Sequence, residues 1–225
     1  MYKKIKVINM KKIALSAFIA LIVSITSKAK ISVDSEIEKK AIEWVASLSL
    51  NDSQKEIRVK NVIITHLTTI RNWHNEHPAT TVPDGINPVT GTKLSELDRS
   101  IIADSAMPST IHQALMEGLR KDLSAEQVEL VLDKYTIGKV AFTIAGYKAI
   151  VPDLTADEEV KILGFLKQAR EQAVDYKNMK QISAIFEIYK TKSEQFLNGN
   201  GRNWRALYSA YSKKIKDEKA AKAKQ

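Results

Sequence analysis

Cysteine is absent from this chain of 225 residues. The chain therefore forms no disulfide, offers no thiol nucleophile and supplies no thiolate ligand to a metal ion. It also lacks the cysteine through which a bacterial lipoprotein carries its lipid. If the protein is exported, we expect it to be free in the periplasm or outside the cell.

Long hydrophobic runs are also missing, apart from one near the N-terminus. Met10 and two lysines precede 13 residues from Ile13 to Ile25, and small residues at positions 27 and 29 follow. About 20 apolar residues are needed to span a bilayer, so this run is too short for a membrane anchor. It predicts a signal peptide over residues 1–29 that is cleaved near Ala29, which makes the protein periplasmic or secreted. The alternative is a buried N-terminal helix.

The basic excess of the chain is concentrated at its two ends. Six of the 35 lysines and arginines lie in residues 1–29, which leaves 29 basic and 26 acidic residues in the mature chain. Residues 213–225 hold six more lysines and only two acids. The folded body lacks the basic stripe that binds nucleic acid, so no nucleic-acid partner is expected. We interpret residues 216–225 as a solvated, lysine- and alanine-rich tail.

Apolar residues recur at helical spacing through most of the mature chain. This spacing predicts a single, mainly α-helical domain over residues 30–215, a bundle of about six to eight helices. Four segments open with a residue that can cap a helix and a glutamate or glutamine three residues later, which is a capping box. These pairs are Ser35 with Glu38, Asn51 with Gln54, Ser124 with Gln127, and Thr155 with Glu158.

A second spacing interrupts the helical pattern between residues 137 and 151. Val140, Phe142 and Ile144 alternate with other residues, and a second alternating set follows the pair Ala145-Gly146. Apolar residues at every second position on both sides of a glycine are typical of a β-hairpin, so we predict a short hairpin or an extended insert here.

Four long stretches of the mature chain resemble a known family. They are GTKLSELDRSIIADSAMPSTIH, GLRKDLSAEQVELVLDKYTIGKVAFTIAGYKAIVPDLT, YKNMKQISAIFEIYKTK and NGNGRNWRALYSAY. Over about residues 36 to 215 the chain is similar to the exported domain-of-unknown-function family 3826. The resemblance implies an exported, sugar-binding protein associated with polysaccharide utilisation in the cell envelope. It assigns no catalytic residues to this chain.

The segment 71–99, RNWHNEHPATTVPDGINPVTGTKLSELDR, is the strongest candidate for a site. It leads from the end of a predicted helix into a loop over residues 78–93, and loops of this length are often functional. Trp73 offers a flat apolar face to a sugar ring, and the polar side chains near it offer hydrogen bonds to hydroxyls. The candidate ligand-binding residues are Trp73, His74, His77, Asp84, Asn87, Asp98 and Arg99.

Two other interpretations of the histidines remain open. His74 and His77 have a spacing at which two imidazoles can share a metal ion, but a third ligand would have to come from Glu76, which points off that helix face, or from a distant carboxylate. His66 is 11 residues from His77, or about 16 Å along a helix, and is too far away. His74 and His77 can also be structural residues near a helix C-terminus. We predict no cofactor and keep a metal ion on His74 and His77 as the weaker alternative.

The sequence favours a carbohydrate-binding or accessory protein, with a poly- or oligosaccharide as its partner. The first alternative is a lyase or hydrolase acting on plant-type polysaccharides through His74 or His77 with Asp98. A helical periplasmic chaperone is the third, because the leucine before three of the helix caps resembles the LTxxQ signature of such chaperones. The sequence determines neither the glycan nor the oligomeric state.

Overall fold

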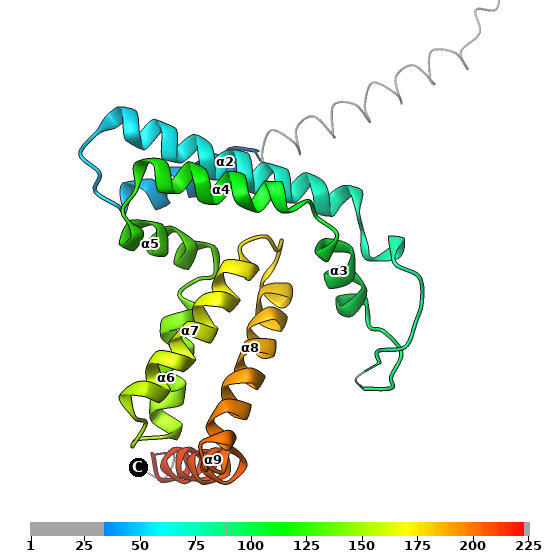
Figure 1. Cartoon of the computed structure of the whole chain (residues 1–225), viewed down its shortest axis with the longest axis vertical. Coiled ribbons are helices and arrows are strands. Elements are labelled where there is room, and N and C mark those ends of the chain that lie inside the picture. The colour runs from blue at the N-terminus through cyan, green and yellow to red at the C-terminus, as the bar shows by residue number, and fades with distance from the viewer. Residues whose placement is uncertain (1–33, 89, 223–225) are drawn as a thin grey trace, which may run out of the picture.

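The computed structural model describes residues 34–88 and 90–222, and within them the fold is mainly α-helical (Figure 1). The signal peptide predicted for residues 1–29 lies outside this part. The described part contains nine α-helices, one more than the upper end of the predicted range. They are residues 34–46, α2 (Ser53–Glu76), α3 (Glu96–Ser105), α4 (Ser109–Asp122), α5 (Ala125–Tyr135), α6 (Lys139–Ile150), α7 (Ala156–Ala173), α8 (Met179–Gly199) and α9 (Trp204–Lys222), with a 3₁₀ turn, η1 (Ala79–Thr81), after α2.

The predicted β-hairpin at 137–151 is wrong, because α6 occupies this segment. Val140, Tyr147 and Val151 are buried, and their separations of seven and four residues are those of one helix face. Phe142, which the alternating pattern placed beside Val140, is 80% exposed. An apolar segment of this length satisfies both spacings, and only its packing against α7 selects the helix.

Local capping explains where several helices begin. Ser124 caps α5 and Thr155 caps α7, each in the predicted capping box. The cap of α2 is wrong by one residue, because Asp52 and not Asn51 accepts the hydrogen bond from the backbone of Lys55. The helix over residues 34–46 already includes Ser35, so Ser35 is not its N-cap.

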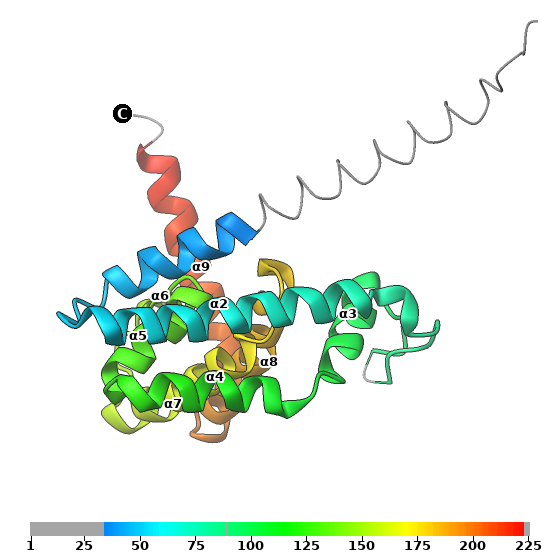
Figure 2. The same ribbon diagram turned by 90° about the horizontal axis from the view of Figure 1, so that it is seen from above.

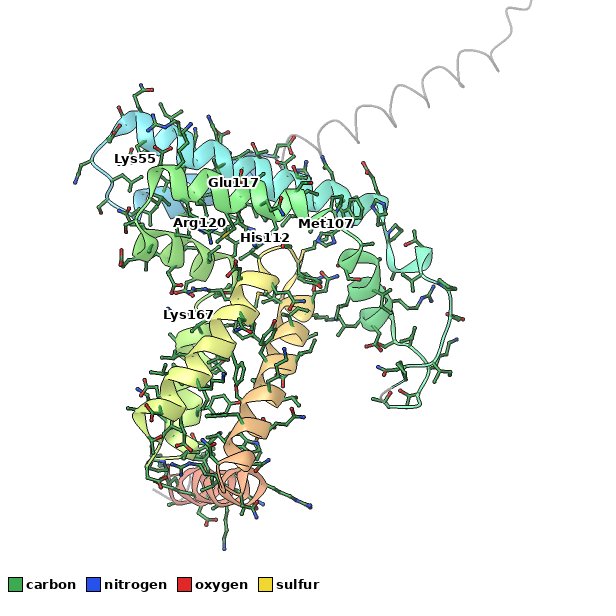
Figure 3. The ribbon with its side chains drawn as sticks, in the orientation of Figure 1. Lys55, Met107, His112, Glu117, Arg120 and Lys167 are labelled. Carbon is green, nitrogen blue, oxygen red and sulfur yellow. The ribbon has the colours of Figure 1, made fainter. Side chains whose placement is uncertain are left out.

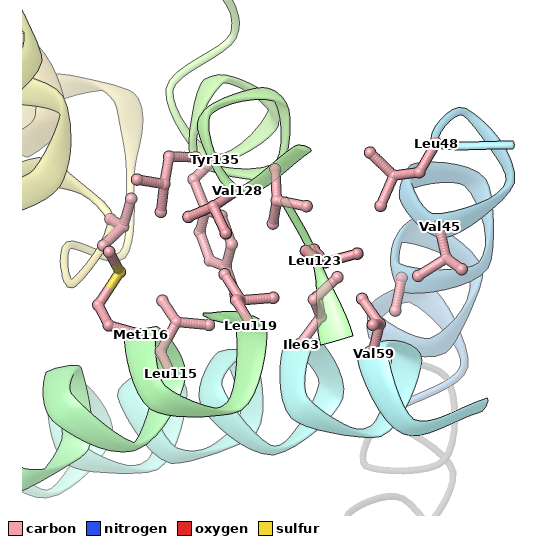
Figure 4. Close-up of a cluster of buried hydrophobic side chains, with 14 residues drawn as sticks. Val45, Leu48, Val59, Ile63, Leu115, Met116, Leu119, Leu123, Val128 and Tyr135 are labelled. Carbon is pink, nitrogen blue, oxygen red and sulfur yellow. The ribbon is translucent and has the colours of Figure 1, made fainter. Parts of the chain in front are cut away.

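The first layer of the fold consists of residues 34–46, α2, α4 and α5. Helices α2 and α4 lie side by side, and the buried side chains of this layer form one hydrophobic cluster (Figures 1 and 4). Full burial of one aliphatic side chain stabilises a fold by about 1.5 to 3 kcal/mol. The cluster consists of Ala41, Val45, Leu48, Val59, Ile63, Leu115, Met116, Leu119, Leu123, Val128, Val131, Leu132, Tyr135 and Val174.

The second layer consists of α6, α7 and α8 around a separate hydrophobic cluster, and runs crosswise to the first (Figure 1). Helix α9 contacts α6 and α8 near its start, where the rings of Trp204 and Tyr147 lie 5.1 Å apart. The rest of α9 stands away from the other helices (Figure 2) and has no buried residue. The tail predicted for residues 216–225 is helical as far as Lys222, where α9 ends. In the described part of the chain, no helix has the length and apolar character to cross a membrane.

Asp175, in the turn between α7 and α8, connects the two layers. Its carboxylate accepts hydrogen bonds from His66 Nε2 of α2 at 3.0 Å and from His112 Nδ1 of α4 at 2.8 Å. His66 Nδ1 is 3.2 Å from the hydroxyl of Tyr135, and His112 Nε2 is 3.6 Å from Glu171 Oε1. Figure 3 labels His112 on α4. The hydrogen bond to Asp175 raises the pKa of His112. Burial acts to raise the pKa of Asp175, but the bonds from His112 and His66 outweigh it and lower that pKa.

We predict opposite stability changes for two glycine substitutions inside helices. A Cβ atom at Gly118 of α4 would lie 2.7 Å from Val62 Cγ2 of α2, so Gly118→Ala should destabilise the protein by about 1 to 3 kcal/mol. Gly146 of α6 has no atom within 4 Å of such a Cβ, and Gly146→Ala should stabilise by about 0.5 to 1 kcal/mol. Denaturant unfolding measures both. Equal effects of the two substitutions would contradict the close packing of α2 on α4.

We also predict that Asp175→Asn destabilises the protein in a pH-dependent way. The raised pKa of His112 stabilises the fold below pH 6.5, and this contribution is lost as the pH rises through the folded-state pKa. The lowered pKa of Asp175 stabilises the fold above pH 3.8, and this contribution is lost as the pH falls through the folded-state pKa of Asp175. Near pH 5.5 the variant should lose about 1.5 to 3 kcal/mol of unfolding free energy.

The loss should become smaller above the folded-state pKa of His112 and at strongly acidic pH. Glu187→Gln is the matched control, because Glu187 forms an exposed ion pair with Lys190 that contributes little. A loss that stays constant from pH 4 to pH 9 would show that charge pairing does not cause it.

Candidate functional site

A pocket of about 600 Å³ lies where the end of α2, η1 and α3 meet the start of α8. This volume falls within the usual range for sites that hold a small molecule. Its walls combine apolar groups, such as Leu97 and Met179, with polar groups from the end of α2, from α3 and from the start of α8. The polar lining residues are His74, His77, Glu96, Ser100, Asp104, Lys177, Asn178, Lys180 and Gln181.

His74 and Asp104 form the buried part of this pocket. His74 Nδ1 donates a hydrogen bond to Asp104 Oδ1 at 2.5 Å, and the two residues are only 6% and 5% exposed. Because a carboxylate can only accept, Nδ1 carries the proton and Nε2 is the free position of the ring. In the described part of the chain, His74 Nε2 is buried without a hydrogen-bond partner. Such an atom costs about 1 to 3 kcal/mol unless a ligand or water satisfies it.

Gln181 of α8 holds the other side of Asp104. Its Nε2 donates to Asp104 Oδ2 at 2.5 Å and to Ser100 Oγ at 3.1 Å. Its Oε1 accepts from Asn178 Nδ2 at 3.0 Å, which fixes the orientation of the amide. The hydrogen bonds thus join α2, α3 and α8, so the floor of the pocket is preorganised.

His77 lies at the mouth of the pocket as the C-cap residue of α2. Its Nδ1 donates to the backbone oxygen of Trp73 at 3.0 Å, which again leaves Nε2 free. The rings of Trp73 and His77 stack with centroids 3.7 Å apart. Trp73 therefore supports the position of His77 but does not line the pocket itself.

The remaining predicted site residues do not line this pocket. Asp84 pairs with Arg99 at 2.9 Å and with Lys93 at 3.1 Å, which ties the loop to α3. Asp98 completes the capping box of α3 with Ser95. The side chain of Asn87 accepts a hydrogen bond from the backbone of Thr90, within the turn of the loop.

Several residues of the pocket were missed by the sequence analysis. Asp104 lies 30 residues beyond His74, and Gln181 lies another 77 residues beyond Asp104. Only the helix-period spacing of Ser100 and Asp104 on α3 hinted at a shared face. No three histidine, aspartate or glutamate side chains in the described ranges are grouped so that they could hold a metal ion.

We predict that a paired substitution restores the hydrogen bonds that a single one breaks. In Asp104→Asn the amide oxygen can still accept from His74, but its NH₂ group faces the NH₂ group of Gln181, at a cost of about 1 to 3 kcal/mol. Gln181→Glu in the same chain supplies an acceptor to that NH₂ group. The double variant should therefore recover at least half of the lost unfolding free energy. Additive losses would show that the Asp104–Gln181 contact is not formed in solution.

Residues 34–217 match the model of a family described as protein of unknown function (DUF3826), which agrees with the resemblance seen in the sequence. No curated protein matches the chain.

Proposed function

The chain belongs to the DUF3826 family, and we propose that it is a carbohydrate-binding protein whose ligand occupies the pocket between α2, α3 and α8. The observation that carries the proposal is Nε2 of the pocket-lining residue His74, which is buried without a hydrogen-bond partner while Asp104 and Gln181 of the same pocket are held by hydrogen bonds. A buried polar atom without a partner is rare in a folded protein, and a bound ligand is one way to satisfy it.

The chemistry of the pocket suits a sugar. Sugar hydroxyls donate and accept hydrogen bonds, and the pocket offers the carboxylate of Glu96 as an acceptor and the ammonium group of Lys180 as a donor. The imidazole of His77, stacked on Trp73, adds a flat ring at the mouth. The pocket holds about one or two sugar units, in keeping with its volume of about 600 Å³.

The predicted signal peptide supports a periplasmic or secreted location for this binding protein. An accessory role in an envelope system for polysaccharide use is the corresponding biological setting, and it comes from the resemblance stated above.

A specific observation favours an enzyme as the second candidate. A histidine whose Nδ1 is held by a buried carboxylate has the arrangement of a general base, with Nε2 free to accept a proton. The carboxylate in this candidate is Asp104 and not Asp98, whose side chain caps α3. A lyase or hydrolase would use His74 in this way on the same saccharide.

A glycan array probed with the purified protein tests the binding function, followed by calorimetric titration of the best ligand. Glu96→Ala should weaken binding about tenfold or more, because a hydrogen bond to a charged group contributes about 1.5 to 3 kcal/mol. Its melting temperature should change little, since Glu96 is exposed. Glu117→Ala is the matched control, an exposed carboxylate on α4 outside the pocket (Figure 3).

Two outcomes would change the proposal. If no glycan binds, or if Glu96→Ala and Glu117→Ala behave alike, the pocket is not the binding site. If the glycan is cleaved during the titration and His74→Ala abolishes cleavage but not binding, the enzyme is the correct function.

A further inference from the structure

Two lysines give one wall of the pocket a positive charge. Lys177 precedes α8 and Lys180 lies in its first turn, and both are exposed. Lys177 Nζ donates to the neutral side chain of Asn75 at 2.9 Å. Within the described ranges, neither lysine has a carboxylate at salt-bridge distance, although sixteen other pairs are formed.

The start of α8 adds to this positive wall. A helix of 21 residues carries a partial positive charge at its N-terminus, where negative groups are stabilised. The first turn of α8 contains no acidic residue. This differs from α3 and α7, whose first turns hold two and three acids. The start of α8 is capped by the neutral side chain of Asn178, whose Oδ1 accepts from the backbone N–H groups of Lys180 and Gln181, and it has no negative side chain to balance the helix dipole.

The negative groups of the pocket do not cancel this charge at the same place. Both carboxylate oxygens of Asp104 already accept hydrogen bonds from His74 and Gln181. Glu96 belongs to α3 and not to α8, and it forms no ion pair with either lysine in the described part of the chain. Independently of the lysines, Nε2 of the pocket-lining residue His74 is buried without a hydrogen-bond partner in the described part of the chain.

We infer that the saccharide bound in this pocket is anionic, with its negative group on the side of Lys177, Lys180 and the start of α8. This inference rests on the proposed function and names its ligand class. The negative group is a uronate carboxylate or a sulfate ester, since both accept hydrogen bonds from lysine and from a helix N-terminus. The neutral hydroxyls of the same sugar lie toward Glu96.

Calorimetric titration of the full chain with three probes tests the inference. The probes are digalacturonate, a monosulfated galactobiose and unmodified galactobiose. At least one anionic probe should bind about tenfold or more tightly than galactobiose. Its affinity should fall as the salt concentration is raised from about 50 to about 500 mM, because salt screens the attraction between exposed charges. The preferred anionic probe identifies the source of the charge.

Lys177→Gln/Lys180→Gln should weaken binding of the preferred anionic probe about tenfold or more and weaken binding of galactobiose much less, so that the preference for the anionic probe is lost. The matched control is Lys121→Gln/Lys134→Gln, two exposed lysines outside the pocket, which should bind like the parent protein. Melting temperatures of both double variants verify that they are folded.

The failures of the two proposals are distinguishable. If galactobiose or a neutral glycan of the array binds as tightly as the anionic probes, or if the two lysine variants behave alike, the inference is wrong and the binding function stands. If no glycan of any charge binds, both are wrong.

Discussion

A carboxylate enclosed by three helices must have every oxygen satisfied, because an ionised group without partners is costly in a dry interior. Asp104 meets this requirement with two hydrogen bonds of 2.5 Å, one from His74 of α2 and one from Gln181 of α8. The position of α3 between these helices therefore depends on this one side chain. The geometry of the pocket follows from it, since His74 is held with its Nε2 free and Gln181 is fixed against Ser100.

The same physical principle joins the two hydrophobic clusters. Asp175 receives hydrogen bonds from α2 and α4 of the first layer while it lies in the turn that leads into α8 of the second. Asp104 and the partly buried Asp175 thus both accept from histidines that α2 or α4 carries. Apolar packing holds each layer together and places Val174, which follows α7, in the first cluster, whereas hydrogen bonds of defined direction fix the orientation of the side chains between the layers. The pocket lies at the border where the layers meet.

The residues that support the site differ from the residues proposed to bind the ligand. Asp84, Arg99, Asp98 and Asn87 stabilise the loop and the start of α3, and Trp73 supports His77. The groups proposed for a ligand are Nε2 of His74 and of His77, the carboxylate of Glu96, and the ammonium groups of Lys180 and of Lys177, which also donates to Asn75. A pocket with a rigid floor and unpaired charges at its walls suits a polar ligand of defined shape, which is the basis of the saccharide proposal.

Local chemistry in the sequence was sufficient to predict the mainly helical fold and the caps at Ser124 and Thr155, whereas the family came from the resemblance of four long stretches. It was insufficient for α6, because its apolar residues satisfy two spacings and only packing against α7 decides between them. The sequence also placed His74 and His77 near a possible site. Their partners Asp104 and Gln181 lie 30 and 107 residues from His74, and no local pattern relates such positions. Only the packing of α3 and α8 against the end of α2 brought them together, because hydrogen bonds between distant residues form only where the tertiary structure aligns them.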